Sequence, residues 1–310
     1  MRDIDAIVYG TVCLDLIWRV DRLAEPGTFV PVIEERRTIG GEASNTAIAL
    51  SRWGVRVALV GTATGDDEEG ELLRRMFAEE APDIDLRYVD TAAGKKTPTC
   101  LCLATPDGHR TMYGTGFEAM QCPVLDPALA RRARVFTMDP NAYAAGLAAC
   151  RMAAEGGAAV YAMDYTRSPE VNHAAEVAVT SHEAVAPNAS TRACEEYATG
   201  IRDRDGCTVI VTCGENGCVV ARQGGNRGPA LHLPAFALDS VVDSTGAGDV
   251  FRAGLIYGKI QGWELEATVP FAAAAAALNC KSMGGWGGVR PVAEIEAFRR
   301  TAPIRPIAEA

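Results

Sequence analysis

The sequence has no uninterrupted apolar stretch of membrane-spanning length. The longest candidate, residues 271–278, is mainly alanine, and a transmembrane helix needs about 20 apolar residues. Residues 1–5 are too acidic and too short in their apolar run for a signal peptide. We therefore expect a cytoplasmic protein with no membrane partner.

The sequence also lacks a basic surplus. Lys and Arg together number 30 against 40 Asp and Glu, so the net charge is −10. Without excess positive charge, a protein has little means of displacing counterions from a nucleic-acid backbone. We expect no nucleic-acid partner, although a nucleotide needs only local positive potential.

Metal-binding and disulfide patterns are absent as well. The chain has ten cysteines but no C-x-x-C pair, and none of its four histidines lies at zinc-ligand spacing from a cysteine pair. Most cysteines have apolar neighbours, as in the segment 100–103, where cysteine acts as a small hydrophobe. Reduced, buried thiols are predicted.

Three common catalytic motifs do not occur. The sequence has no G-x-x-x-x-G-K-[ST], which excludes a P-loop, and no G-x-S-x-G, which leaves a serine hydrolase unsupported. No G-x-G-x-x-G follows the first predicted strand, which weakens a dinucleotide-dehydrogenase interpretation.

What the chain does contain is an alternation of apolar runs and amphipathic segments. Strands are predicted at 4–10, 55–61, 135–138, 158–163 and 207–212, and helices at 43–53, 67–80, 142–154, 248–260 and 264–282. This alternation predicts an α/β fold whose largely parallel sheet is covered on both faces and binds ligands at the carboxyl ends of its strands. No linker divides the 310 residues, so one domain is expected.

Two segments break the alternation. Residues 28–38 and 97–114 are extended and polar-alternating, with a turn predicted at 106–108 in the second. They form either edge strands of the main sheet or a small separate sheet that covers the strand ends as a lid.

The most informative segment is 243–249, D-S-T-G-A-G-D, which leads into an apolar helical pattern. Gly246 and Gly248 allow the backbone to lie close to a ligand, and the amides that begin a helix attract anions. Asp249 would lie beside a phosphate bound there and could accept a proton from an attacking hydroxyl. The plainer alternative is a glycine-rich helix start with an acidic residue in its first turn.

This segment resembles the carboxyl-terminal signature of the ribokinase-like (PfkB-type) carbohydrate kinases. The resemblance implies a three-layer αβα sandwich with a mostly parallel central sheet, and a small β-sheet lid contributed by residues 12–38 and 97–116. It further implies that Asp249 is the catalytic base. The amides of Gly246, Ala247 and Gly248 would be the anion hole for the γ-phosphate.

Other segments match the family's substrate site. G-G-E-A-S-N at 40–45 resembles its G-G-x-x-x-N motif, which implies sugar contacts from Gly41 and Asn45. Asp15 follows the first strand, where the family has a carboxylate that accepts hydrogen bonds from substrate hydroxyls; the alternative is a loop cap. Asp139, at the end of a central strand, is a further substrate candidate. Arg167 is either a contact for an anionic substrate or an exposed structural arginine.

A third match concerns the nucleotide. V-T-C-G-E-N-G at 211–217 resembles the segment that lines the ATP site in the family, which implicates Thr212, Gly214 and Gly217. Asn188 matches the first position of the family's N-x-x-E motif. The resemblance implies ATP and Mg²⁺ as cofactors and leaves a monovalent cation open.

The chain departs from the family at three functional positions. Thr191 stands where N-x-x-E has its glutamate, with Glu195 or Glu196 as substitutes through space; Ala273 replaces an asparagine near the adenine; Arg252 replaces a small or amide residue. These changes affect the expected metal arrangement and nucleotide preference, but they leave the base and the anion hole in place.

The predicted function is ATP-dependent phosphorylation of a hydroxymethyl group on a sugar or related polyol. A nucleoside kinase of the same fold and a non-catalytic sugar-binding protein are the alternatives. The lid strands of this family can pair between subunits, so the resemblance also implies a homodimer through the lid.

Overall fold

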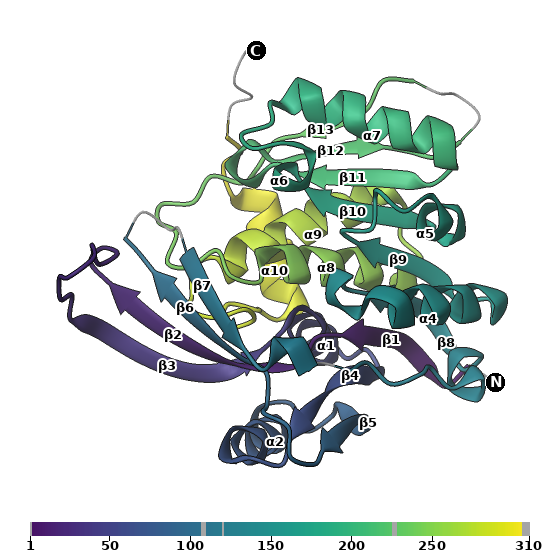
Figure 1. Cartoon of the computed structure of the whole chain (residues 1–310). Coiled ribbons are helices and arrows are strands. Elements are labelled where there is room, and N and C mark those ends of the chain that lie inside the picture. Colours follow the sequence, from purple (N-terminus) through teal and green to yellow (C-terminus); the bar gives the residue numbers. More distant parts are fainter. Residues whose placement is uncertain (1, 107–109, 120, 225–227, 306–310) are drawn as a thin grey trace.

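A nine-stranded sheet forms the centre of the molecule in the computed structural model, which describes residues 2–106, 110–119, 121–224 and 228–305 (Figure 1). The strand order is β13-β12-β11-β10-β9-β8-β1-β4-β5, parallel from β5 to β11 and antiparallel for β12 and β13. The strands are β1 (Ile4–Gly10), β4 (Val57–Gly65), β5 (Asp85–Ala92), β8 (Ala133–Met138), β9 (Ala159–Met163), β10 (Val177–Ser181), β11 (Thr208–Thr212), β12 (Cys218–Ala221) and β13 (Leu231–Leu233).

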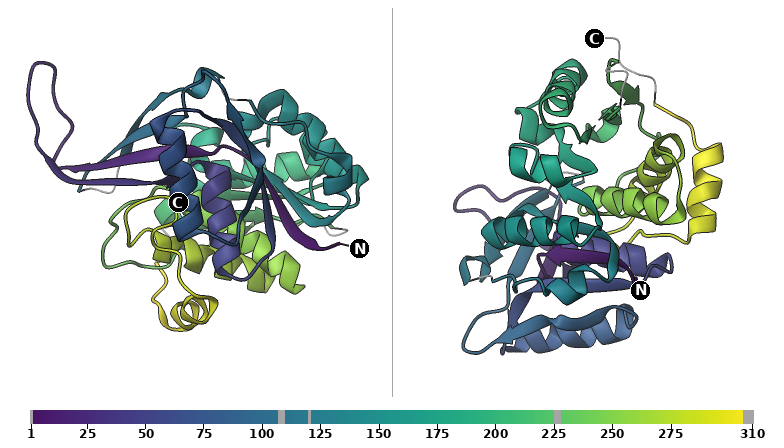
Figure 2. Two further views of the ribbon diagram at one scale, coloured as in Figure 1. Left: turned by 90° about the horizontal axis from the view of Figure 1, so that it is seen from below. Right: turned by 90° about the vertical axis from the view of Figure 1, so that its right-hand side faces the viewer.

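Helices cover both faces of this sheet, as Figure 2 shows, so the molecule is the predicted three-layer sandwich. One face carries α1 (Glu42–Arg52), α2 (Glu68–Glu80), α8 (Ala247–Gln261), α9 (Leu265–Asn279) and α10 (Val292–Thr301). The other carries α3 (Pro127–Ala130), α4 (Tyr143–Glu155), α5 (Pro169–Ala174), α6 (His182–Val185) and α7 (Thr191–Asp205). None of the described helices has the length and apolarity needed to cross a membrane.

A second, four-stranded sheet has the order β3-β2-β6-β7 and extends away from the main sheet (Figure 1). It consists of β2 (Cys13–Val20), β3 (Val32–Gly40), β6 (Thr99–Ala104) and β7 (Arg110–Thr115). The two extended segments therefore form a separate sheet rather than edges of the main one. The predicted turn at 106–108 falls mostly outside the described residues.

The chain order places the strand ends of β1 and β8 at a switch point. From β1 the main sheet grows in one direction through β4 and β5, and in the other through β8, β9, β10 and β11. In open α/β sheets such a reversal leaves a crevice at the carboxyl ends of the strands, where ligands bind. Both excursions into the second sheet, after β1 and after β5, leave the main sheet on the same side of this crevice.

Candidate active site

Asp249 lies in the first turn of α8, and its carboxylate is buried with 6% of its surface exposed. Burial raises the pKa of Asp249 to about 6, against the lowering effects of the Arg252 charge and a hydrogen bond from Asn45. A carboxylate with a pKa near neutral is a better proton acceptor than an ordinary aspartate and is still largely ionised at physiological pH.

The turn before α8 has the geometry of an anion site. Gly246 is the N-cap with a φ of 71°, and a Cβ there would lie 1.9 Å from the Gly285 carbonyl oxygen, so only glycine fits. The N–H of Ala247 donates to the Ser244 carbonyl at 3.2 Å and closes the turn. The following amides, of Gly248 and Asp249, begin a helix and have no partner within it.

Asp243, the first residue of the signature, has a structural contact on each oxygen. Its carboxylate accepts hydrogen bonds from the amides of Thr245 at 2.8 Å and Gly284 at 2.9 Å. Asp243 therefore connects the anion turn to the loop of Gly284 and Gly285, which leaves no space for a side chain at position 246.

The substrate motif and the signature meet directly. Asn45 Nδ2 donates to Asp249 Oδ2 at 2.8 Å, and a Cβ on Gly285 would overlap the Asn45 amide. Asn45 Oδ1 is buried without a hydrogen-bond partner. Asn45, expected as a sugar contact, thus orients Asp249 through its nitrogen and keeps an unused acceptor.

Arg252, one turn further along α8, is completely buried. Its guanidinium donates to Thr46 Oγ1 at 2.7 Å and to the carbonyl oxygens of Glu42 at 2.8 Å and Met138 at 3.0 Å. Its Nη2 lies 3.5 Å from Asp249 Oδ1. This departure from the family pattern therefore places a fixed positive charge behind the proposed base and links α1, β8 and α8.

Asp15 reaches the same region from the second sheet. It is 4% exposed, and the thiol of Cys13, 3.4 Å from Asp15 Oδ1, is its hydrogen-bond donor. A Cβ on Gly40 would lie 2.1 Å from the Asp15 carboxyl carbon, so the first glycine of the G-G pair makes room for this side chain. Burial raises the pKa of Asp15 to about 7, and the charges of Asp249 and Asp243 add to the shift.

Gly41 allows two backbone segments to approach closely rather than making room for a side chain. It is the N-cap of α1 with a φ of 96°, and a Cβ there would lie 2.3 Å from the Thr11 carbonyl oxygen. This close approach brings the start of α1 against the loop that follows β1.

Asp139 lies at the switch point between β1 and β8. Its carboxylate accepts hydrogen bonds from the amides of Thr11 at 2.6 Å and Asn141 at 3.1 Å, and burial raises its pKa. A Cβ on Gly10 would lie 2.2 Å from Asp139 Oδ2. Main-chain donors therefore already occupy both oxygens of this predicted substrate residue. Arg167, the other candidate, donates to the Ala184 carbonyl oxygen at 2.6 Å.

Arg110, on β7 of the second sheet, was not predicted. Its Nη1 donates to Ser244 Oγ at 3.0 Å, which joins the second sheet to the signature. Its positive charge also lowers the pKa of Asp15 and of Asp249. No local pattern distinguishes this arginine, because its contact with the signature joins residues 134 positions apart.

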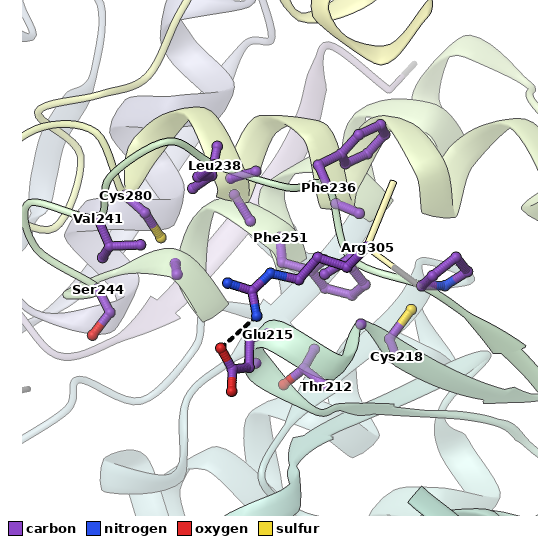
Figure 3. Close-up of a pocket in the computed structure, with 18 of the residues that line it drawn as sticks. Thr212, Glu215, Cys218, Phe236, Leu238, Val241, Ser244, Phe251, Cys280 and Arg305 are labelled. Carbon is purple, nitrogen blue, oxygen red and sulfur yellow. Dashed lines mark hydrogen bonds and ion pairs between the residues drawn. The ribbon is translucent and has the colours of Figure 1, made fainter. Parts of the chain in front are cut away.

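A cavity lies beside the signature and is lined mainly by small and apolar residues (Figure 3). Thr212, Gly214 and Gly217, the predicted nucleotide contacts, line one wall, and Ala273 lies on the α9 wall. Arg305 forms an ion pair with Glu215 at 2.6 Å, and both side chains border the cavity. The further lining residues include Ser244, Ala247, Gly248, Phe251, Ala276, Ala277 and Cys280.

The structure does not bring Asn188 into this cavity. Asn188 is exposed in the loop before α7, with a φ of 56°, and is not among the described lining residues. Of the two glutamates considered as substitutes, Glu196 pairs with Arg192 at 3.1 Å on the outer surface. Glu195 faces the end of β11, where its charge contributes to raising the pKa of Cys213.

Glu42, in the G-G-E-A-S-N motif, adds a further carboxylate. Its Oε2 is buried without a hydrogen-bond partner. Burial raises the pKa of Glu42 well above its usual range; the charges of Asp139, Asp249 and Asp164 add to this, and Arg252 opposes it. Glu42 therefore favours its neutral, protonated form among the neighbouring carboxylates.

The comparisons with known proteins agree with this geometry. The model of the pfkB family carbohydrate kinases matches residues 3–127 and 142–289. A nucleoside kinase of Methanothermobacter thermautotrophicus is 25% identical over 296 residues, covering 91% of each chain. An ATP-dependent ribose-1-phosphate kinase of Halopiger xanaduensis is 29% identical over 282 residues, covering 89% of this chain and 91% of its own length.

Solved structures show the same fold. The Arabidopsis thaliana ribokinase complexed with ribose and ATP superposes with a TM-score of 0.81 at 18% identity, covering 96% of this chain and 99% of its own. A nucleoside kinase of Burkholderia thailandensis in complex with inosine gives a TM-score of 0.77 at 20% identity, covering 96% and 97%. By fold, by signature and by the family match along most of its length, this chain belongs to the pfkB family of carbohydrate kinases.

Proposed function

We propose that this protein transfers the γ-phosphoryl group of ATP to a hydroxymethyl group of a sugar or related polyol. One observation carries the proposal: Asn45 of the substrate motif donates to Asp249 of the signature at 2.8 Å, so acceptor and phosphate motifs share one buried carboxylate. Asp15 lies close enough to Asp249 that the charge of Asp249 adds to the raised pKa of Asp15, so both carboxylates belong to the same crevice.

The steps follow from the chain's own residues. Asp15 accepts hydrogen bonds from acceptor hydroxyls, and a site built on such bonds discriminates strongly against an analogue that lacks one. Asp249 takes the proton of the attacking hydroxyl as the new O–P bond forms and the bond to the β-phosphate oxygen breaks. The amides of Gly248 and Asp249, together with Arg110, stabilise the charge on the transferring group.

The cavity bordered by Thr212, Gly217 and Ala273 fits ATP. Its small and apolar lining accommodates a planar base, and it opens beside Ser244 and Gly248, where the anion turn lies. The unpartnered Glu42 Oε2 and the nearby Asp164 provide hard oxygen donors for Mg²⁺, which neutralises phosphate charge when bound. These oxygens would supply the metal contacts that Thr191 cannot.

We further propose that the second sheet is a lid that excludes water from the crevice. Arg110 would then couple its position to the signature through Ser244. The exposed Ile33, Met112 and Tyr113 on this sheet offer apolar area for a second copy of the chain, consistent with a homodimer through the lid.

A nucleoside acceptor is the second candidate. The names of the Methanothermobacter and Burkholderia relatives favour it, since both are nucleoside kinases. The exposed rings of Phe29, in the loop that joins β2 to β3, and of Tyr113, on β7, are available for stacking on a base.

Transfer of phosphate from ATP, measured across sugars, sugar phosphates, sugar acids and nucleosides, tests the proposal. We expect the best acceptor to carry a primary hydroxyl and Asp249→Asn to lower kcat by about 10²–10⁴-fold, the usual contribution of a general base. Unchanged activity in Asp249→Asn would refute the mechanism. ATP binding without turnover on any acceptor would favour the non-catalytic alternative.

A further inference from the structure

Two cysteines of the second sheet lie against Asp15, which the local sequence did not indicate. β2 and β6 are parallel neighbours with Asp15 opposite Cys100, and Cys102 is on the same face because side chains alternate along a strand. One donor atom from each of Asp15, Cys100 and Cys102 lies within 4.8 Å of the others. Among the described residues, these three make up the candidate cluster of metal-ligand type.

The spacing of the two sulfurs suits a tetrahedral metal. The Sγ atoms of Cys100 and Cys102 are 3.7 Å apart. Two thiolates bound to one zinc ion at about 2.3 Å in tetrahedral geometry would be separated by about 3.8 Å. The site therefore needs little movement of either strand to take such an ion.

The surroundings also favour a soft, thiol-preferring ion over Mg²⁺ or Ca²⁺. Asp15 and Cys102 are 4% and 2% exposed, and Cys102 packs against Ile17 and Met283. The Cys13 thiol, 3.4 Å from Asp15 Oδ1, is a third sulfur at the edge of the cluster. Two thiols and one carboxylate offer donors that zinc binds well, whereas hard cations prefer several oxygens.

We propose that Asp15, Cys100 and Cys102 form a binding site for a thiophilic divalent cation of the Zn²⁺ type. Binding breaks the two S–H bonds, forms two metal–sulfur bonds and releases both protons to solvent. Asp15 supplies the third ligand, and water takes the open fourth position. Because the metal occupies the carboxylate assigned to acceptor hydroxyls, it competes with the acceptor; this consequence rests on the proposed function.

Titration of the reduced protein with Co²⁺, as an optical probe, tests the site directly in the presence of a phosphine reductant that prevents disulfide formation. We expect one Co²⁺ per chain with a thiolate-to-metal charge-transfer band, and stoichiometric displacement by Zn²⁺. Cys100→Ser and Cys102→Ser should each weaken binding at least tenfold and lose intensity in that band. Cys122→Ser, which changes a half-buried thiol elsewhere, should leave both unchanged.

The absence of a charge-transfer band in the wild-type protein would overturn the inference, as would a band that persists in the Cys100→Ser/Cys102→Ser double variant. The thermal melt of each variant, measured without metal, separates loss of ligands from loss of fold. In the kinase assay, Zn²⁺ should raise the KM for the acceptor in the wild-type protein and not in Cys100→Ser. The optical readout needs no turnover, so failure of the proposed function would leave this inference standing.

Discussion

At the scale of single residues, the proposed mechanism makes activity depend on the ionisation of two buried carboxylates. Asp249 and Asp15 have pKa values raised to about 6 and about 7 by burial, far above an ordinary aspartate. In the proposed mechanism both act in their ionised form, one as a base and the other as an acceptor of hydrogen bonds. The positive charge of Arg252 lowers the pKa of Asp249 and so favours the ionised form of the proposed base.

We therefore expect kcat/KM to fall as the pH is lowered from 7 to 5. Protonation of Asp249 and Asp15 inactivates the free enzyme, so the acid limb should approach a slope of two protons. Arg252→Met removes the charge that lowers the pKa of Asp249 and should move this limb to higher pH. Arg252→Lys, which keeps the charge, should move it less.

The comparison of the pH profiles of the two Arg252 variants separates this role from mere packing. Both variants lose hydrogen bonds to Thr46 and to two carbonyl oxygens, so both should unfold at lower urea concentration than the wild-type protein. An acid limb that stays in place in Arg252→Met would show that Arg252 acts on structure alone.

At the scale of elements, α8 has a left-handed glycine at each end, which makes a matched pair of positions. Gly246 has a φ of 71° and Gly262 a φ of 73°. A Cβ on Gly246 would lie 1.9 Å from the Gly285 carbonyl oxygen, whereas nothing lies within 4 Å of a Cβ on Gly262. Conformational strain is thus nearly equal at the two ends, and only the first borders the anion turn.

Gly246→Ala should lower kcat/KM for ATP at least 100-fold, because the turn must open to relieve the overlap and its amides leave their positions. Gly262→Ala should cost about 1–2 kcal/mol of stability, the strain of a left-handed alanine, and leave kcat/KM within twofold. Steady-state kinetics and urea unfolding of both variants check this. Equal losses of activity would show that strain in α8, rather than the anion turn, is responsible.

Much of the element order could be predicted from the sequence, because helices and buried strands have distinct local periods. β1 spans the predicted residues 4–10, and α2, predicted at 67–80, spans Glu68–Glu80. β5 and β10 were not predicted; β5 is an edge strand with a polar-rich sequence. The approach of Cys100 to Asp15 depends on pairing between strands about 85 residues apart, which no local pattern encodes.

At the scale of the whole molecule, the site is a source of instability. Asp15 binds a proton in the folded protein up to a pH of about 7 but in the unfolded chain only up to about 4. Between these values the folded state holds more protons, so the free energy of unfolding decreases as the pH rises. The enzyme therefore loses stability over the same pH range in which its carboxylates become functional.

Asp15→Asn should remove this cost. We expect its free energy of unfolding to exceed that of the wild-type protein at pH 8 by on the order of 2–4 kcal/mol. The two values should approach each other at pH 3, where Asp15 is mostly neutral in both the folded and the unfolded chain. Calorimetry across this range measures the difference. A stability gain of equal size at both pH values would contradict the role of charge.

The structure brings together some, but not all, of the candidate residues that the family resemblance implied. Asp15, Asn45, Asp249 and the glycine turns meet in one crevice, because the motifs follow strands whose ends lie together. Asn188 remains outside the nucleotide cavity. The contact of Arg110 with Ser244 joins residues 134 positions apart, so the sequence around Arg110 does not encode it.

The hydrogen bond between Asn45 and Asp249 joins residues 204 positions apart. A ribosome that has made only the first half of this chain has therefore not yet made the proposed base. The Asn45 amide can orient Asp249 only after most of the polypeptide has been synthesised and α8 has packed against α1. A chain truncated before α8 could bind an acceptor weakly. Because it lacks Asp249, it would transfer no phosphate from ATP.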